Sequence, residues 1–182
     1  GKQVYENNKY DVTNSETGER IKDWGLDEKI PVKVVNYPVR CIGNEAPLDI
    51  EFTTTKNFLV VSQWGPRKNI ENTVKWFVDE FKDDEDVGLV LKTNTASDSI
   101  MDRERTFTTL GRLLKIHTPS DRKCKIYALH GDISEEQLTW LYRHPTMKAL
   151  INIGHGEGFG LPLFEAACNG LPLIPPTWSG QM

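Results

Sequence analysis

NFLVVSQWGPRKNIENTVKWFVDEF, residues 57–81, contains the pattern that decides the fold. Residues 57–62 form a continuous apolar run of the length of a buried strand. The rest of the stretch carries apolar side chains at spacings that place them on one face of a helix: Ile70, Val74, Phe77, Val78 and Phe81. A short apolar run followed by a segment of helical periodicity is one βα unit, from which parallel sheets are built.

The same alternation continues along the chain from this unit. Further strands are predicted at residues 88–91, 125–129, 148–153 and 171–175. Ser134 with Gln137 three residues later forms a capping-box pattern that starts one of the intervening helices. Pro162, a residue favoured in the first helical turn, marks the start of the next helix. We therefore predict an α/β fold, a Rossmann-like doubly wound parallel sheet with helices on both faces.

The domain is expected to span residues 31–182, after a polar lead-in or linker at residues 1–30 that holds at most one short helix. Residues 32–39 are β-branched and bounded by proline, which is typical of an edge or crossover strand. Both faces of a parallel sheet are normally covered, and the last predicted strand is followed by no helix. We therefore expect a domain that is incomplete at its C-terminus.

Composition excludes several classes of function. A formal net charge of -4, from 22 basic and 26 acidic residues, leaves no basic stripe for nucleic acid. No apolar run approaches the length of a membrane span, and the N-terminal residues lack a signal-peptide core. Cys41, Cys124 and Cys168 are odd in number and lack metal-ligand spacing, which favours reduced thiols. A soluble, cytoplasmic protein is the expectation.

A glycine-rich turn lies between the fourth predicted strand and its helix, at residues 154–160. Its glycines let the backbone approach a ligand closely, and the helix start that follows attracts anions such as a phosphate or diphosphate. Two carboxylates, Glu157 and Glu165, flank this turn. Carboxylates accept hydrogen bonds from vicinal hydroxyls, so their presence beside a phosphate site favours a sugar-bearing ligand.

Residues 157–174, EGFGLPLFEAACNGLPLI, resemble the E-x7-E region of the group 1 retaining glycosyltransferases, the family that includes glycogen and sucrose synthases. The resemblance implies one half of a GT-B fold, the half that binds a nucleoside diphosphate sugar such as UDP-glucose or GDP-mannose. It implies that Glu165 holds the ribose hydroxyls and that Glu157 contacts the donor sugar as a catalytic residue. The diphosphate would lie on the backbone of Gly158, Phe159, Gly160 and Leu161.

Two further βα turns match the family's pattern. In residues 61–70, Lys68 occupies the position of a lysine that neutralises the leaving diphosphate, and we predict it to be catalytic. The usual arginine position holds Gln63, which is a departure, so Arg67 is the candidate for the second positive charge. Gly131 lies in the turn that generally packs around the nucleotide base. His155, inside the glycine-rich turn, is a further candidate for a phosphate or sugar hydroxyl.

No cofactor and no metal are expected, since the acidic segment at residues 83–86 ends an amphipathic helix and is typical of a solvated loop. The resemblance implies transfer of a sugar with retained configuration, to an acceptor sugar, lipid or protein that the sequence does not identify. It also implies a partner GT-B domain for the acceptor, without which this chain is expected to bind donor but not to turn over.

Two other readings of the glycine-rich turn stay open. One is a nucleotide-binding module that keeps the fold without catalysis. The other, less favoured, is an NAD-dependent Rossmann enzyme, whose glycine fingerprint belongs to the first βα unit rather than the fourth.

Overall fold

The computed structural model describes residues 10–24, 38–39 and 43–178. The chain divides into two compact units, residues 1–38 and residues 39–182. The described part of the first unit is an antiparallel pair of strands, β1 (Tyr10–Thr13) and β2 (Arg20–Trp24). The second unit contains the parallel sheet and every helix described below.

The sheet of the second unit has five parallel strands in the order β5-β4-β3-β6-β7. Their bounds are Lys56–Val61 for β3, Val87–Lys92 for β4, Lys125–Leu129 for β5, Met147–Ile151 for β6 and Leu173–Ile174 for β7. The chain therefore builds outward from β3 in one direction and then returns to add β6 on the other side of β3. This reversal is the topological switch point beside which open α/β sheets bind ligands.

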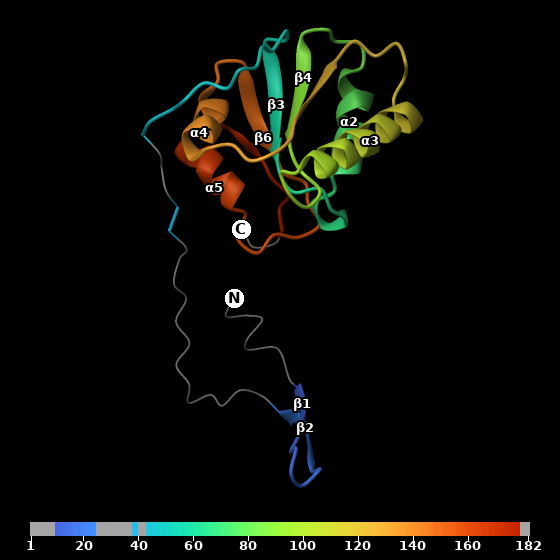
Figure 1. The fold of residues 1–182 in the computed structure, drawn as a ribbon, viewed down its shortest axis with the longest axis vertical. Coiled ribbons are helices and arrows are strands. Elements are labelled where there is room, and N and C mark those ends of the chain that lie inside the picture. The colour runs from blue at the N-terminus through green and yellow to red at the C-terminus, as the bar shows by residue number, and fades with distance from the viewer. Residues whose placement is uncertain (1–9, 25–37, 40–42, 179–182) are drawn as a thin grey trace. The chain divides into compact units, whose positions relative to one another are not determined.

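Helices cover both faces of the sheet, as Figure 1 shows: α2 (Ile70–Phe81) and α3 (Ile100–His117) on one face, α4 (Glu135–Arg143) and α5 (Leu161–Cys168) on the other. Two apolar clusters fill the spaces between the layers. Val60 and Leu89 point into the cluster under α2 and α3, while Leu59 and Val90 point into the cluster under α4 and α5. Neighbouring strand residues thus face opposite layers, which explains why these strands are continuously apolar.

The prediction of a doubly wound parallel sheet is confirmed. The five predicted strands and the helix start at Ser134 are also confirmed, the latter with both hydrogen bonds of the capping box in place. The described part of residues 1–30 forms the β1-β2 pair, which the sequence analysis did not predict, and the rest of that segment lies outside the described residues. The predicted boundary at residue 30 and most of the predicted strand at residues 32–39 lie outside the described residues.

The cysteine prediction needs a correction. Cys168 at the end of α5 is exposed and disulfide-bonded, where a reduced thiol was expected. Cys124 is a free, buried thiol, as expected, and burial raises its pKa. Cys41 lies outside the described residues. The apolar composition around Cys168 favoured burial, but the face of α5 that carries it points to solvent.

Candidate functional site

The loops after β3 and β6 meet at the switch point of the sheet. The loop after β3 contains the 3-10 turn η1 (Pro66–Lys68), and the loop after β6 is the glycine-rich turn. The backbone N–H of His155 donates to the Arg67 carbonyl at 2.7 Å, and the Asn69 side-chain amide donates to the Ile153 carbonyl at 3.1 Å. A Cβ at Gly154 would lie 3.1 Å from the same Arg67 carbonyl, so this close approach favours glycine.

A cluster of charges lies where the two loops meet. Lys68 Nζ forms an ion pair with Glu157 Oε1, and Arg67 Nη1 lies 3.4 Å from Glu157 Oε2. The Arg67 guanidinium also donates to the Gly156 carbonyl. The side chains of Lys68 and Glu157 are 17% and 8% exposed, whereas that of Arg67 is 58% exposed. The two predicted catalytic residues, Lys68 and Glu157, are thus brought into direct contact.

The pKa of Glu157 reflects this contact. Burial alone raises it, but the hydrogen bond and charge of Lys68, with the nearby Arg67, bring the pKa below the usual value for a glutamate. The carboxylate is therefore ionised at neutral pH and holds both cations at the mouth of the glycine-rich turn.

A pocket of about 360 Å³ opens beside this cluster. It is lined by residues from the carboxyl ends of β3 and β4 and from the first turn of α5: Val61, Ser62, Gln63, Arg67, Lys68, Lys92, Thr93, Asn94 and Pro162. Three lysine or arginine side chains make it suited to an anion, and the start of α5 adds the positive end of a helix dipole. The geometry is that of an anion site at a switch point.

Lys92 and Asn94 belong to this pocket and escaped the sequence analysis. Burial lowers the pKa of Lys92, and the charge of Asp132 opposes that effect. Their position in the sequence could have identified Lys92 and Asn94. Both come shortly after the second predicted strand of the parallel sheet, at the edge where such sheets bind ligands.

Gln63 lines the pocket and donates its side-chain amide to the Thr95 carbonyl at 2.9 Å. Its neutral amide ties the loops after β3 and β4 together, and no positive charge stands at this position. Arg67, by contrast, places its guanidinium on the same pocket. Arg67 and Lys68, the two neighbouring cations of η1, therefore supply the positive charge on the β3 side of the pocket.

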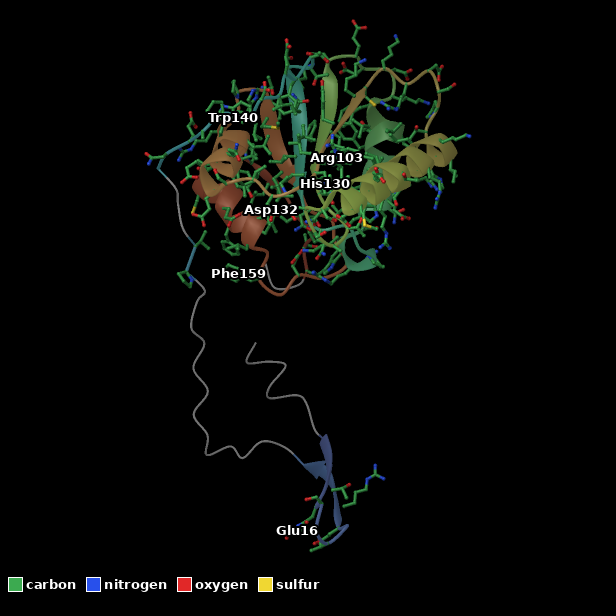
Figure 2. The ribbon with its side chains drawn as sticks, in the orientation of Figure 1. Glu16, Arg103, His130, Asp132, Trp140 and Phe159 are labelled. Atoms are coloured by element: carbon green, nitrogen blue, oxygen red, sulfur yellow. The ribbon has the colours of Figure 1, made fainter. Side chains whose placement is uncertain are left out.

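The end of the glycine-rich turn is shaped by one backbone conformation. Gly160 has φ of 81° and caps α5, and its carbonyl accepts the N–H of Leu163 at 2.9 Å. Leu161 is the first residue of the helix and Gly158 is exposed. Phe159, labelled in Figure 2, stacks on Phe164 with ring centroids 4.5 Å apart. This stacking fixes the turn against the helix that follows it.

Glu165 lies one turn inside α5 and contacts α4. The Tyr142 hydroxyl donates to its Oε2 at 3.2 Å. Burial raises the pKa of Glu165, and the Tyr142 hydrogen bond partly offsets the rise. Burial, and then the nearby Glu165, raises the pKa of the Tyr142 hydroxyl, which stays protonated as a donor. Glu165 is thus held by α4 rather than by the Lys68 cluster, so it marks a separate part of the site.

Gly131 follows β5 with φ of 92°, a conformation that favours glycine. Beside it, His130 Nε2 hydrogen-bonds the Asp102 carboxylate of α3 at 2.9 Å, and both side chains are buried. Asp102 also accepts the backbone N–H groups of Thr95 and Ala96. Because both partners are buried, this pair braces the turn from inside the domain.

His155 does not line the pocket beside the Lys68 cluster. It lines a second pocket of about 280 Å³, together with Trp64, Gly65, Pro66, Asn69, Ile70, Glu71 and Asn72. The structure thus brings Arg67, Lys68 and Glu157 together, and joins Gln63 to them through the first pocket. His155 contacts that group through its backbone but lines a different space.

The acidic segment at residues 83–86 contributes hydrogen bonds that stabilise the nearby loop. Asp86 accepts from both the backbone and the hydroxyl of Thr55, and the hydrogen bonds lower its pKa. Within the described ranges, no cluster of three or more His, Cys, Asp or Glu residues could hold a metal ion. None of the helices that the structure describes is both long enough and apolar enough to span a bilayer.

No protein-family model matches the chain. Comparison with curated proteins found the serotype-specific mannosyltransferase WbdA of Escherichia coli, 34% identical over 120 residues. The match covers 65% of this chain and 13% of the relative, so the chain spans only a small part of that protein's length.

Solved structures with the same fold include the OtsA apo structure, with a TM-score of 0.59 and 14% identity over 94% of this chain and 42% of that chain. Another is the trehalose-6-phosphate protein from E. coli bound with UDP-2-fluoro glucose, with a TM-score of 0.51, 13% identity, and 69% and 30% coverage. The C-terminal domain of LpcC, a glycosyl transferase group 1 family protein from Francisella tularensis, gives a TM-score of 0.50, 13% identity, and 67% and 58% coverage.

Proposed function

We propose that the parallel-sheet unit is a domain of a group 1 glycosyltransferase of the GT-B fold, and that it binds the nucleoside diphosphate sugar from which a glycosyl group is transferred. The observation that carries the proposal is the meeting of Arg67, Lys68 and Glu157 at the switch point of the sheet, beside a cationic pocket. Anions bind where cations, helix starts and glycine-rich backbone converge.

The proposed binding mode assigns each part of the donor to one part of the site. The diphosphate lies in the pocket lined by Lys68 and Lys92 and against the backbone of residues 158–161. The ribose hydroxyls donate to Glu165, whose carboxylate is oriented by Tyr142. The base lies toward the turn at Gly131, and the donor sugar lies near Glu157.

The proposed chemistry is electrostatic. When the glycosidic bond to the diphosphate breaks, negative charge grows on the leaving oxygen, and Lys68 with Arg67 is placed to stabilise it. These cations and the helix start would take the role that Mg²⁺ plays at other phosphate sites. Glu157 positions the two cations in the absence of donor, through the ion pairs described above. We propose that transfer retains the anomeric configuration, as in the resembling family.

We further propose that the acceptor and the groups that activate it come from a second Rossmann-like half, since the GT-B fold pairs two. The curated relatives are named mannosyltransferases, so mannose is the first donor sugar to test. Location in the cytoplasm, where nucleotide sugars are made, fits this proposal.

Isothermal titration calorimetry tests the proposal most directly. The protein is titrated with GDP-mannose, UDP-glucose and ADP-glucose, as wild type and as Glu165→Ala. Binding of at least one donor, weakened by about tenfold in the variant, is expected because a charge-assisted hydrogen bond contributes about 1.5–3 kcal/mol. Failure of every donor to bind a protein shown by circular dichroism to be folded would refute it.

A further inference from the structure

The second pocket, defined by Trp64, Glu71, Asn72 and His155 with the backbone of residues 65–66, is not explained by the donor site. Both pockets border η1, the second through Pro66 and the cationic one through Arg67 and Lys68. With a volume of about 280 Å³, it is slightly smaller than the roughly 300–1,000 Å³ typical of ligand pockets. A single sugar ring is a suitable occupant for that space.

Its charge separates it from the neighbouring pocket. The cationic pocket is lined by Arg67, Lys68 and Lys92, whereas the residues that line the second pocket include one carboxylate and no lysine or arginine. A carboxylate without a compensating cation disfavours phosphate by like-charge repulsion. The second pocket therefore suits a neutral ligand rather than part of the nucleotide.

Its polar groups suit hydroxyls. The Glu71 carboxylate accepts hydrogen bonds, and the Trp64 indole N–H donates one. Asn72 donates its amide N–H to Asn69 Oδ1 at 2.7 Å, and this leaves its own Oδ1 as an acceptor. Asn69 is in turn tied to the Ile153 carbonyl, so the Asn72 side chain is oriented before a ligand arrives.

Trp64 adds an aromatic surface. One reading is that it is simply a core residue, because it packs against the apolar cluster under α2. It nevertheless remains partly exposed and lines the pocket. An aromatic ring anchored on one side by the core offers the C–H face of a pyranose a rigid partner, while carboxylate and amide groups bind the hydroxyl edge. This combination distinguishes a saccharide site from an apolar groove.

We infer that this pocket binds a neutral pyranoside ring of the acceptor, with η1 bordering both this pocket and the donor site. The inference rests on the proposed function, since it assigns a saccharide acceptor to a domain proposed to bind the donor. It names a substrate class for the acceptor and places part of its recognition on this domain.

Nuclear magnetic resonance of the tryptophan indole N–H signals tests the inference. The protein is titrated with methyl α-D-mannopyranoside and, separately, with UDP and GDP. The Trp64 signal is assigned with Trp64→Phe. Trp76, which is 53% exposed on α2 and does not line the pocket, is assigned with Trp76→Phe and serves as the internal control. The Trp64 signal is expected to shift and saturate with the glycoside at a dissociation constant on the order of millimolar, while the Trp76 signal stays in place.

Variants of the two polar groups complete the test. Glu71→Gln and Asn72→Ala are expected to weaken glycoside binding by about tenfold, the loss typical of a charge-assisted or well-oriented hydrogen bond. Their affinity for the nucleoside diphosphate should stay within about twofold of wild type, since neither residue lines the cationic pocket.

The outcomes separate the two claims. If the protein binds nucleotide but the Trp64 signal does not move when glycoside is added, this inference is overturned and the donor proposal stands. A Trp64 shift with nucleotide but not with glycoside assigns the pocket to the donor and also overturns it. Absence of nucleotide binding overturns the proposed function, and the acceptor assignment falls with it.

Discussion

Removing the cation at Lys68 should weaken nucleoside diphosphate binding more than removing the cation at Arg67. Lys68 is 17% exposed and lines the cationic pocket, so its contact with phosphate is partly shielded from water. A charge-assisted hydrogen bond of about 1.5–3 kcal/mol corresponds to roughly 10- to 150-fold in affinity. Lys68 must give up part of its ion pair with Glu157 to bind phosphate, so we expect a loss near tenfold for Lys68→Met.

Arg67 is the matched comparison. Its side chain is 58% exposed and lies 3.4 Å from the same carboxylate, and exposed ion pairs contribute only about 0–1 kcal/mol. Arg67→Met should therefore weaken binding by less than about fivefold. Glu157→Gln removes the group that competes for Lys68 and should leave UDP affinity unchanged or raise it.

The assay is calorimetric titration of UDP and GDP into wild type, the three single variants and the double variant Lys68→Met with Glu157→Gln. The double variant matters because Lys68→Met alone removes the cation that pairs with the nearly buried Glu157 carboxylate. Thermal unfolding of each protein controls for lost structure. A Lys68→Met affinity within twofold of wild type, in either background, would contradict the assignment of Lys68 to the diphosphate.

Other residues give further tests. Tyr142→Phe removes the hydrogen bond that lowers the pKa of Glu165, so nucleotide affinity should begin to fall at a higher pH than in wild type when the solution is acidified. The pKa of Asp102 is lowered to about 2, mainly by the hydrogen bond from its histidine partner. The charged carboxylate therefore contributes its full stabilisation above the ordinary pKa of 3.8, and this stabilisation is lost as the pH falls toward 2. The stability difference between wild type and Asp102→Asn in urea should accordingly shrink over that range. Gly88→Ala should destabilise the domain by about 1–3 kcal/mol, because the added Cβ would lie 2.2 Å from the side-chain oxygen of the buried asparagine in β3.

The Gly88 test has a control within the chain, and each of the other two has an outcome that would contradict it. Gly111 lies inside α3 with nothing within 4 Å of an added Cβ, so Gly111→Ala should be neutral or stabilising by up to about 1 kcal/mol. Equal losses at both glycines in urea unfolding would contradict the steric reason given for Gly88. A pH-independent difference for Asp102→Asn would show that its pairing with His130 does not depend on the carboxylate charge. An unchanged pH profile in Tyr142→Phe would separate Glu165 from nucleotide binding.

The sheet could be predicted because its signals are local. The apolar run at residues 57–62 and the helical spacing that follows are contained in one βα unit, and the capping box at Ser134 marks a helix start without reference to tertiary contacts. The β1-β2 pair was missed because its strands lack sustained apolar alternation. Its register depends on cross-strand pairing rather than on a recognisable pattern.

The site could be predicted only in part. The glycine-rich turn and Lys68 carry motifs, so both were found, but their direct contact through Glu157 depends on the strand order and could not be read from spacing. The same is true of Tyr142, whose link to Glu165 joins α4 to α5. The exposure of Cys168 depends on which face of α5 meets the sheet. Its apolar neighbours in the sequence favoured a buried position, which the structure does not show.

The placement of β3 between β4 and β6 has a consequence for folding kinetics. The pairing of β3 with β6 joins residues such as Phe58 and Ala149, which are far apart in sequence, whereas β3 and β4 are closer neighbours along the chain. Contacts of long sequence separation form slowly, so we expect the docking of β6 to be a late event. Because η1 and the glycine-rich turn belong to the two sides of that junction, a bound nucleotide would stabilise the docked state, and by more as its concentration rises above the dissociation constant. Backbone amides of β6 should then exchange with solvent more slowly when nucleotide is present.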